Sequence, residues 1–312
     1  MKAAQITQYG DANVVAVRPD APRPTAATGK VLVEVHAASL NPVDSSIRQG
    51  YMHQMAPLTF PATLGIDIAG VVIEADPAGP ALNVGDRVFG SASVLAGGSG
   101  AFAEYASAPT AVLAKAPARM SFSEAAALPL AGASALQALE TLKPVEGSTI
   151  LVVGGSGGIG SFAIQIAKRL GAHVIATARG PAVDFVKSLG VDQVIDLATG
   201  GLPTSIRKCD FVLDTAGGEA YKAAFSALKK GATILTMAAR PDAELAGKHG
   251  VTALGQMTDV KGPILERLAR LVDDGAITVH LHRSFSLEQV QDAFRVREAG
   301  HVGGKIVLEI RA

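Results

Sequence analysis

The clearest chemical signal in the sequence is a glycine-rich segment near the middle of the chain. Directly after the apolar run Thr149–Val153 comes a match to the pattern GxGxxG, formed by Gly155-Ser156-Gly157-Gly158-Ile159-Gly160. In such a loop the first glycine permits a tight turn, the second lets the backbone approach a pyrophosphate, and the third allows close packing of helix on strand. The amides that open the following helix are free to bind the anion. The pattern predicts a dinucleotide site, the alternative being a glycine turn without a ligand.

The same letters also fit GxxxGxG, through Gly154, Gly158 and Gly160, which is the form typical of short-chain dehydrogenases. That family needs a tyrosine followed four residues later by a lysine, and none of the four tyrosines here has one. Its glycine motif also opens the chain, whereas a long segment precedes the motif in this sequence. The short-chain alternative is therefore excluded.

The residues after the second expected strand favour one form of the dinucleotide. NAD-binding chains place an Asp or Glu there, on the ribose 2′-hydroxyl. This strand ends Ala176-Thr177-Ala178-Arg179, and the next acid is Asp184, inside the following helix. The planar fork of Arg179 suits a 2′-phosphate, and Thr177 can add a hydroxyl. We therefore expect NADP(H); the other interpretation of Arg179 is a solvated loop arginine.

Apolar strands and helical stretches alternate through the middle of the chain, which predicts a parallel sheet covered on both faces. The expected strands are Thr149–Val153, His173–Thr177, Gln193–Ile195, Phe211–Leu213, Ala232–Thr236 and Val251–Leu254. The expected helices include Ile159–Leu170, Ala182–Leu189 and Tyr221–Lys229. Six such strands make an α/β, doubly wound Rossmann fold.

The ends of the chain follow a different pattern. The first 115 residues show short strands between turns, among them Lys30–Ala38, Ile66–Ala75, Phe102–Ala106 and Val112–Lys115. This predicts an antiparallel, barrel-like domain. Near the C-terminus we expect a helix over Pro263–Asp273, a strand near Ile277–His282, a helix near Leu287–Glu298 and a last strand over Lys305–Ile310. This tail resumes the pattern of the N-terminal domain.

Composition excludes several classes of function. The chain has 312 residues, 28 basic and 28 acidic, no Trp and 48% hydrophobic residues. Zero net charge gives no electrostatic reason to expect nucleic acid or an anionic membrane as a partner. We find no membrane-spanning segment, no signal peptide, and a single cysteine, Cys209, which excludes an intrachain disulfide. A cytoplasmic location is the expectation.

Several motifs, in matching order, resemble the zinc-independent, zeta-crystallin-like quinone oxidoreductase branch of the medium-chain dehydrogenase/reductase superfamily. They are VLVEVHAASLNPVD (Val31–Asp44), IRQG (Ile47–Gly50), FPATLGIDIAGVV (Phe60–Val72), VGDRVFG (Val84–Gly90), GAFAEY (Gly100–Tyr105), AALPLAGASALQAL (Ala126–Leu139) and GGKIVLEI (Gly303–Ile310). The resemblance implies a Rossmann NADP-binding domain, residues 121–276, inserted in a strand-rich GroES-like barrel domain that carries the substrate and catalytic residues, 1–120 and 277–312. It also implies a homodimer.

The sequence departs from the alcohol dehydrogenase branch at the zinc ligands. That branch uses a Cys and a Gly-His-Glu unit, where this chain has Leu40-Asn41-Pro42-Val43-Asp44 and Gly65-Ile66-Asp67. Ile66 cannot bind metal, and the pair His280 and His282 lacks a third ligand. We therefore expect no metal and disfavour alcohol oxidation.

The resemblance carries three catalytic residues onto this chain. Asn41, in NPVD, implies an amide that donates to a substrate carbonyl or to the nicotinamide ribose; the other interpretation is an Asn bonded to its own turn before Pro42. Ser134 stands where the family has a Thr that contacts the nicotinamide. Tyr51 approximates a Tyr beside the substrate. We interpret Asp44 as the N-cap of a short helix, Ser45–Gln49.

The resemblance also implies further contacts with the cofactor. Ala216 and Gly217, after the fourth expected strand, and Met237, after the fifth, would approach the adenosine or nicotinamide portions. Lys305 matches a basic position that touches the pyrophosphate; the alternative is a lysine at a strand edge.

These observations lead to the hypothesis of an NADPH-dependent reductase that transfers a hydride to a quinone or an α,β-unsaturated carbonyl, both small molecules. Two alternatives stay open. An enoyl-thioester (enoyl-CoA) reductase would use the same fold but needs a basic mouth for the CoA phosphate. A non-catalytic NADPH-binding sensor would explain the lack of an unambiguous acid, base or nucleophile.

Overall fold

The computed structural model describes residues 1–54, 57–75, 82–203, 205–206, 208–300 and 302–311. The chain divides into two compact units. The strand-rich unit comprises Met1–Ala133, Val260–Gly275 and Val279–Ala312, and the parallel-sheet unit comprises Ser134–Asp259 and Ala276–Thr278.

The strand-rich unit is built on two sheets. The larger one has the order β15-β16-β3-β5-β6-β8, with β7 also paired to β3, and the smaller one has the order β2-β1-β4. All pairs are antiparallel except β15 with β16. The strands are β1 (Ala3–Ile6), β2 (Ala16–Arg18), β3 (Lys30–Leu40), β4 (Ala62–Thr63), β5 (Asp67–Ala75), β6 (Arg87–Ser91), β7 (Tyr105–Pro109), β8 (Leu113–Lys115), β15 (Leu281–Ser286) and β16 (Lys305–Glu309).

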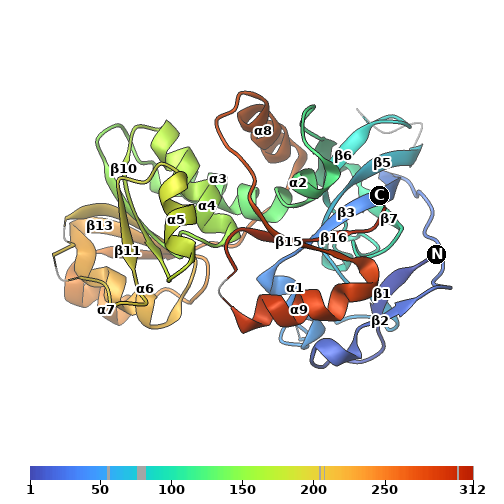
Figure 1. The fold of residues 1–312 in the computed structure, drawn as a ribbon, viewed down its shortest axis with the longest axis horizontal. Helices are drawn as coiled ribbons and strands as arrows, with labels where there is room; N and C mark the ends of the chain where they lie inside the picture. The colour runs from blue at the N-terminus through green and yellow to red at the C-terminus, as the bar shows by residue number, and fades with distance from the viewer. Residues whose placement is uncertain (55–56, 76–81, 204, 207, 301, 312) are drawn as a thin grey trace. The chain divides into compact units, whose positions relative to one another are not determined.

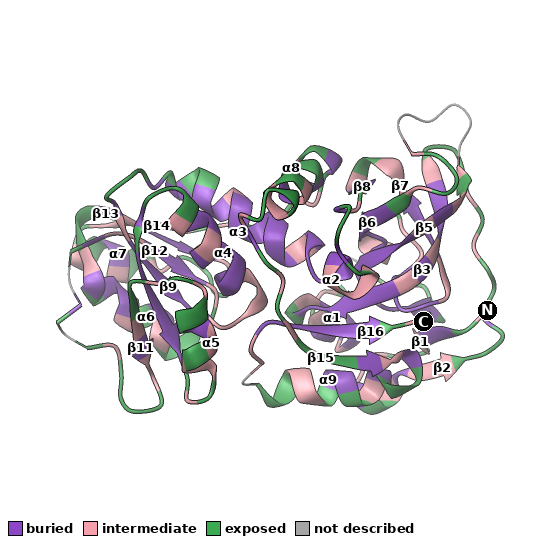
Figure 2. Cartoon of the chain, turned by 45° about the horizontal axis from the view of Figure 1, so that its top comes forward, coloured by how far each residue is buried: buried purple, intermediate pink, exposed green. Residues whose placement is uncertain are grey.

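Helices pack around these sheets (Figure 1). They are α1 (Pro42–Arg48), α2 (Phe122–Ala126), α8 (Gly262–Asp273) and α9 (Val290–Ala299), and α3 (Pro129–Leu142) begins in this unit and continues in the next. In Figure 2 strands β3, β5 and β16 are largely buried, whereas α8 and α9 each present one exposed side. The rings of Phe102 and Phe294 meet edge to face in this core, with centroids 6.1 Å apart.

The parallel-sheet unit has six strands in the order β11-β10-β9-β12-β13-β14, all paired in parallel. This is the doubly wound order 3-2-1-4-5-6. The strands are β9 (Thr149–Val153), β10 (His173–Ala178), β11 (Gln193–Asp196), β12 (Cys209–Asp214), β13 (Leu228–Thr236) and β14 (Thr252–Gly255). The helices between them are α4 (Gly158–Arg169), α5 (Ala182–Ser188), α6 (Gly218–Ala224) and α7 (Ala243–His249). The predicted α/β architecture, a Rossmann sheet together with a strand-rich domain, is confirmed.

Three expected elements have other bounds than predicted, and one helix is additional. The helix expected over Tyr221–Lys229 ends at Ala224, because Leu228 and Lys229 already belong to β13. The strand expected near Ile277–His282 occupies Leu281–Ser286, where it pairs with β16. The strand expected over Phe102–Ala106 lies at Tyr105–Pro109, on β3. Helix α7 was not expected; the Asp242 side chain caps it by accepting from the Leu245 amide at 2.9 Å.

The start of α1 corrects the interpretation of Asp44. The helix begins at Pro42, not at Ser45, because proline lacks an amide hydrogen and suits the first helical position. Asn41 is the N-cap residue, and its backbone amide donates to Oδ2 of Asp44 at 2.7 Å. Asp44 is therefore the third residue of the helix rather than its cap.

The division into units also differs from the boundary drawn on the sequence at residue 121. Helix α2 packs on β3 and β5, and α8 packs on β8, so both lie with the strand-rich unit. None of the helices in the described ranges is long and apolar enough to cross a membrane.

Candidate functional site

Three strand ends bring distant polar residues together in the strand-rich unit. β3 ends at Leu40, next to Asn41, and β16 begins at Lys305. Because Ile306 of β16 pairs with Leu40, Lys305 comes beside Asn41. β5 begins at Asp67, which pairs with Ser39 of β3. The register of one sheet therefore assembles the group that we call the buried polar cluster: Ser39, Asn41, Asp44, Asp67 and Lys305.

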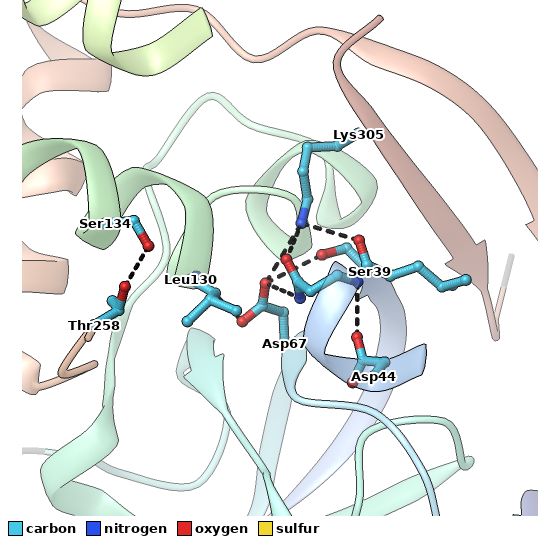
Figure 3. Close-up of polar contacts among 9 residues, drawn as sticks. Ser39, Asp44, Asp67, Leu130, Ser134, Thr258 and Lys305 are labelled. Carbon is cyan, nitrogen blue, oxygen red and sulfur yellow. Dashed lines mark hydrogen bonds and ion pairs between the residues drawn. The ribbon is translucent and has the colours of Figure 1, made fainter. Parts of the chain in front are cut away.

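Asn41 connects the cluster, because its side chain bonds both Lys305 and Asp67. Figure 3 shows Lys305, Asp67, Ser39 and Asp44 gathered in one place. The ammonium of Lys305 donates to Asn41 Oδ1 at 2.5 Å and to the Leu40 carbonyl at 3.2 Å. The Asn41 amide donates to Oδ2 of Asp67 at 2.9 Å. These partners fix the amide orientation, since its oxygen faces a cation and its nitrogen faces a carboxylate. The Asn41 side chain thus bonds across the sheet, to β16 on one side and to β5 on the other.

The Asp67 carboxylate accepts three hydrogen bonds and forms one ion pair. Oδ2 accepts from Asn41 and from the Ser39 hydroxyl at 3.2 Å, and it lies 3.7 Å from the Lys305 ammonium. Oδ1 accepts from the Leu130 amide at 3.2 Å. A buried carboxylate with this many donors keeps its charge more easily than an isolated one.

Burial opposes the charges of the cluster. Asp67 is fully buried, and desolvation raises its pKa. Desolvation lowers the pKa of Lys305, while the nearby carboxylates counteract this change. Desolvation also raises the pKa of Asp44 to about 7. Oδ1 of Asp44 is buried with no hydrogen-bond partner in the described part of the chain, so this carboxyl group lacks the support that Asp67 has.

Lys305 is not the exposed strand-edge lysine of the alternative interpretation, because β16 is paired on both sides and the side chain is 5% exposed. Tyr51 lies in a turn after α1, 77% exposed.

The glycine loop, Gly154–Gly160, joins β9 to α4 in the parallel-sheet unit. The motif predicted that Gly155 makes the tight turn. In the structure Gly154 makes it instead, with φ +84°. A Cβ on Gly160 would lie 2.2 Å from the Gly154 carbonyl oxygen, which explains the close helix–strand approach. A Cβ on Gly157 would meet no protein atom nearer than 3.5 Å. The space beside Gly157 at the start of α4 therefore suits a pyrophosphate, as does the set of helix amides there without intrahelical partners.

Two threonines hold this loop from neighbouring strands. The Gly154 amide donates to Oγ1 of Thr177 at 2.9 Å, and the Gly155 amide donates to the Thr177 carbonyl at 2.9 Å. Thr215 donates its hydroxyl to the Val153 carbonyl at 2.8 Å. Thr177 is 2% exposed, so its side-chain oxygen supports the loop from behind.

The loops after β12 and β13 are tied together by Asp214. Its Oδ1 accepts from the amides of Ala216 and Gly217 at 3.1 and 2.9 Å, and its Oδ2 accepts from the Thr236 hydroxyl at 2.6 Å. The Met237 amide donates to the Asp214 carbonyl at 2.9 Å. The three expected residues, Ala216, Gly217 and Met237, therefore lie on one hydrogen-bonded edge of the sheet.

Two more expected residues have partners that the sequence did not suggest. The Ser134 hydroxyl, 1% exposed, lies 2.5 Å from Oγ1 of Thr258, so the two hydroxyls are hydrogen-bonded (Figure 3). Arg179 is exposed after β10, and its guanidinium donates to the Leu197 carbonyl at 3.4 Å. Within the described ranges, no three His, Cys, Asp or Glu residues are grouped so that they could hold a metal ion.

Sequence reasoning missed the roles of several polar residues: Ser39, Asp67, Asp196, Asp214, Thr236 and Thr258. A signal existed for two of them, since Asp67 opens a strand directly before the apolar run Ile68–Ile73 and Asp214 closes one directly after the apolar run Phe211–Leu213. A charge in such a place must find partners.

Comparison with known proteins agrees with this geometry. Residues 27–118 match the alcohol dehydrogenase GroES-like domain, and residues 189–308 match the domain described as zinc-binding dehydrogenase. The structure of the quinone oxidoreductase from Coxiella burnetii is 33% identical, with a TM-score of 0.91, and the alignment covers 100% of this chain and 99% of that one.

Three curated relatives span most of the chain. The chloroplast envelope quinone oxidoreductase homolog of Arabidopsis thaliana is 33% identical over 99% of this chain and 98% of its own length. The 2-methylene-furan-3-one reductase of Solanum lycopersicum is 35% identical over 99% and 79%. The mitochondrial NAD(P)H oxidoreductase RTN4IP1 of Mus musculus is 33% identical over 90% and 82%.

Two of these names contradict an expectation. They assign the relatives to the chloroplast envelope and the mitochondrion, so the cytoplasmic location inferred from the sequence is wrong by this comparison. That inference used the lack of a recognisable leader, and a leader is independent of the fold and the site.

The resemblance seen in the motifs is confirmed by identities above 30% along nearly the whole chain. The relatives share one reaction class, which makes this chain an oxidoreductase with a nicotinamide cofactor. It belongs to the quinone oxidoreductase branch of the medium-chain dehydrogenase/reductase superfamily.

Proposed function

We propose that the protein is an NADPH-dependent, zinc-independent reductase that transfers a hydride to a quinone or an α,β-unsaturated carbonyl. One observation carries the proposal most directly: the Asp67 carboxylate, which stands at the position of a zinc-site residue in the alcohol dehydrogenase branch, is bonded to Asn41, Ser39 and Leu130 and paired with Lys305. A carboxylate engaged in this way has little capacity left for a metal ion.

The chain's own residues fit the cofactor. The amides at the start of α4 and the space beside Gly157 would bind the pyrophosphate, and Arg179 would bind the 2′-phosphate. The bound nicotinamide supplies the hydride. Ala216, Gly217 and Met237 would line the remainder of the dinucleotide. Ser134 would contact the nicotinamide through its hydroxyl, which is hydrogen-bonded to the hydroxyl of Thr258.

In the strand-rich unit, the side-chain amide of Asn41 would donate one hydrogen bond to the ligand. Lys305 occupies its oxygen and Asp67 takes one amide hydrogen, which leaves the second amide hydrogen for a substrate carbonyl or a ribose hydroxyl. Such a donor stabilises the oxyanion that develops as hydride adds to a conjugated carbonyl. Lys305 and Asp67 would be positioning residues for Asn41, and Tyr51 would lie beside the substrate. The proton would come from water.

The names of the relatives point to the acceptor. One is a quinone oxidoreductase homolog and another reduces 2-methylene-furan-3-one, an enone. Both acceptors place a carbonyl in conjugation with a carbon that takes hydride. We therefore propose conjugated carbonyls as the substrate class.

The test is oxidation of NADPH and of NADH by the purified protein, with an ortho-quinone and a simple enone as acceptors and with a chelator in a parallel arm. We expect turnover that is faster with NADPH and insensitive to the chelator. Loss of turnover with the chelator, restored by zinc, would overturn the metal-free reaction. Crotonyl-CoA as the only productive acceptor would favour the thioester alternative.

The role of Asn41 can be tested with one variant of this residue and one control variant elsewhere in the same unit. Asn41→Asp keeps the shape but replaces the donor with a carboxylate, and we expect kcat to fall at least tenfold. Thr110→Val, at a half-buried side chain that bonds the Gly29 carbonyl in the same unit, is the control and should retain activity.

We also propose a homodimer that forms through β14. This strand is the last in the order of its sheet, so one edge of its backbone is available for pairing with a second copy. Light scattering after size-exclusion chromatography would give the mass. The Gln256 amide bonds the Thr236 carbonyl of β13, and backbone groups alternate in direction along a strand, so the Ala253 amide faces the free edge. Ala253→Pro, which removes that amide, should yield a monomer if β14 is the interface.

A further inference from the structure

In the sequence no acid follows β10 closely, which favours NADPH, but the tertiary structure supplies an acid there from another strand. β11 ends at Asp196, which pairs with Ala178, the last residue of β10. The carboxyl ends of neighbouring parallel strands lie at the same edge of a sheet, so Asp196 and Arg179 lie side by side. They are separated by a whole helix in the sequence.

Hydrogen bonds fix Asp196 to the turn that carries Arg179. Its Oδ1 accepts from the Gly180 amide at 3.0 Å and from the Ala198 amide at 2.8 Å. The guanidinium of Arg179 reaches over the same strand end and donates to the Leu197 carbonyl at 3.4 Å. The two side chains therefore share one small region of the surface.

The charge of this carboxylate is secure at neutral pH. The amides of Gly180 and Ala198 bond to the ionised form and lower the pKa of Asp196, and the positive charge of Arg179 lowers it further. Both amides use the same oxygen, Oδ1, so the lone pairs of Oδ2 can accept from a ligand hydroxyl.

We propose that Asp196 is a second determinant of cofactor choice, which opposes Arg179 and lets the enzyme use NADH as well as NADPH. The carboxylate repels a 2′-phosphate and accepts from a 2′-hydroxyl, whereas Arg179 attracts the phosphate. The balance between one cation and one anion sets a moderate preference for NADPH rather than an exclusive one. This inference rests on the proposed cofactor site at the end of β10.

The chain offers clean variants. Asp196→Asn keeps an oxygen for the amides of Gly180 and Ala198 while it removes the charge, so the turn is preserved. Arg179→Gln removes the opposing charge. Asp184→Asn is the matched control, because it removes one negative charge from the next helix, where Asp184 pairs with Lys187.

Binding is measured without turnover, by calorimetric titration of the intact protein with NADPH, NADH, adenosine 2′,5′-bisphosphate and 5′-AMP. Exposed charge pairs change an affinity by about two- to fivefold. We expect Asp196→Asn to tighten NADPH and adenosine 2′,5′-bisphosphate by about threefold and to weaken NADH by about twofold. Arg179→Gln should weaken NADPH by about fivefold and leave NADH within about twofold. Both changes should shrink in high salt.

Each outcome separates the inference from the proposed function. If Asp196→Asn changes NADPH and NADH by the same factor, or changes neither, Asp196 is no determinant and the inference fails while the proposed function stands. The inference also fails if Asp184→Asn reproduces the shift, since the effect would then be one of net charge. If the unmodified protein binds neither cofactor, the proposed function itself fails.

Discussion

The glycine loop and the buried polar cluster position atoms by opposite means. In the loop, backbone approaches backbone because side chains are missing, as at Gly160, where a Cβ would lie 2.2 Å from the Gly154 oxygen. In the cluster, charged and amide groups are held by one another, as where Lys305 meets Asn41 at 2.5 Å. The loop is contiguous in sequence, whereas Lys305 and Asn41 are separated by 264 positions.

This difference implies different weaknesses. A site made from the absence of side chains is sensitive to added volume and insensitive to pH. A site made from buried charges is sensitive to the loss of any partner, because the remaining charge is left in a region of low polarity. Four predictions test this contrast.

The largest effect should come from Lys305→Met, which leaves Asp67 buried beside an apolar side chain. Removal of one partner of a buried ion pair typically costs about 3–5 kcal/mol. We expect a loss of about 3 kcal/mol in the free energy of unfolding, measured by urea denaturation. The double variant Lys305→Met/Asp67→Asn should regain most of it. Equal losses in the single and double variants would show that the two charges do not act as a pair.

The glycine loop allows a matched pair of substitutions with the same added methyl group. Gly160→Ala should destabilise the protein by about 2 kcal/mol, since its Cβ has no room beside the Gly154 carbonyl. Gly157→Ala has φ −72° and open space, so its unfolding should be unchanged while its affinity for NADPH falls about tenfold. Normal cofactor affinity in Gly157→Ala would place the pyrophosphate elsewhere.

Asp44→Asn should show that the stability of the buried polar cluster depends on pH. With its pKa raised to about 7, Asp44 keeps a proton in the folded state that the unfolded chain releases above about pH 4. Its contribution to stability is therefore greatest at low pH and is lost as the pH rises towards 7, by about 1.4 kcal/mol per pH unit at most.

The amide of the variant still accepts from the Asn41 backbone and carries no charge near Asp67, Lys305 or Arg297. We expect Asp44→Asn to be more stable than the unmodified protein by about 2 kcal/mol at pH 8 and nearly equal to it at pH 5. Thermal unfolding at the two pH values measures the difference. A gain of the same size at both would mean that Asp44 does not titrate in this range.

The smallest effect should come from Thr177→Val, which removes the acceptor for the Gly154 amide. One such hydrogen bond is worth about 1 kcal/mol. We expect a loss of that size in unfolding free energy, with Thr177→Ser close to the unmodified protein. A larger loss in cofactor affinity than in stability would reveal a direct contact between Thr177 and the ligand.

The parallel sheet was largely predictable from local pattern. Thr149–Val153 was predicted to the residue, and all six strands were expected close to their observed positions. One helix was predicted with a wrong end, at Lys229. Leu228 and Lys229 belong instead to β13, which pairs with β12. Pairing with a distant strand overrides local helical preference.

The cluster was predictable only in part. Asn41 and Lys305 were each singled out, and neither the contact between them nor their shared partner Asp67 was foreseen. Asp44 was assigned the wrong position in its helix, because the cap was placed after Pro42 rather than before it. The sequence has no acid directly after Arg179. The acid beside Arg179 is Asp196, at the end of the neighbouring strand β11.

Four features could be read from local sequence alone: the glycine loop, the alternation of strands and helices, the family, and the residues that differ from a zinc site. These follow from neighbours within a few positions, where backbone geometry and side-chain periodicity act directly. The network of Lys305, Asn41 and Asp67, and the position of Asp196 beside Arg179, become visible in the folded chain. Such contacts depend on strand register, which is set by the packing of the whole sheet and not by any short segment.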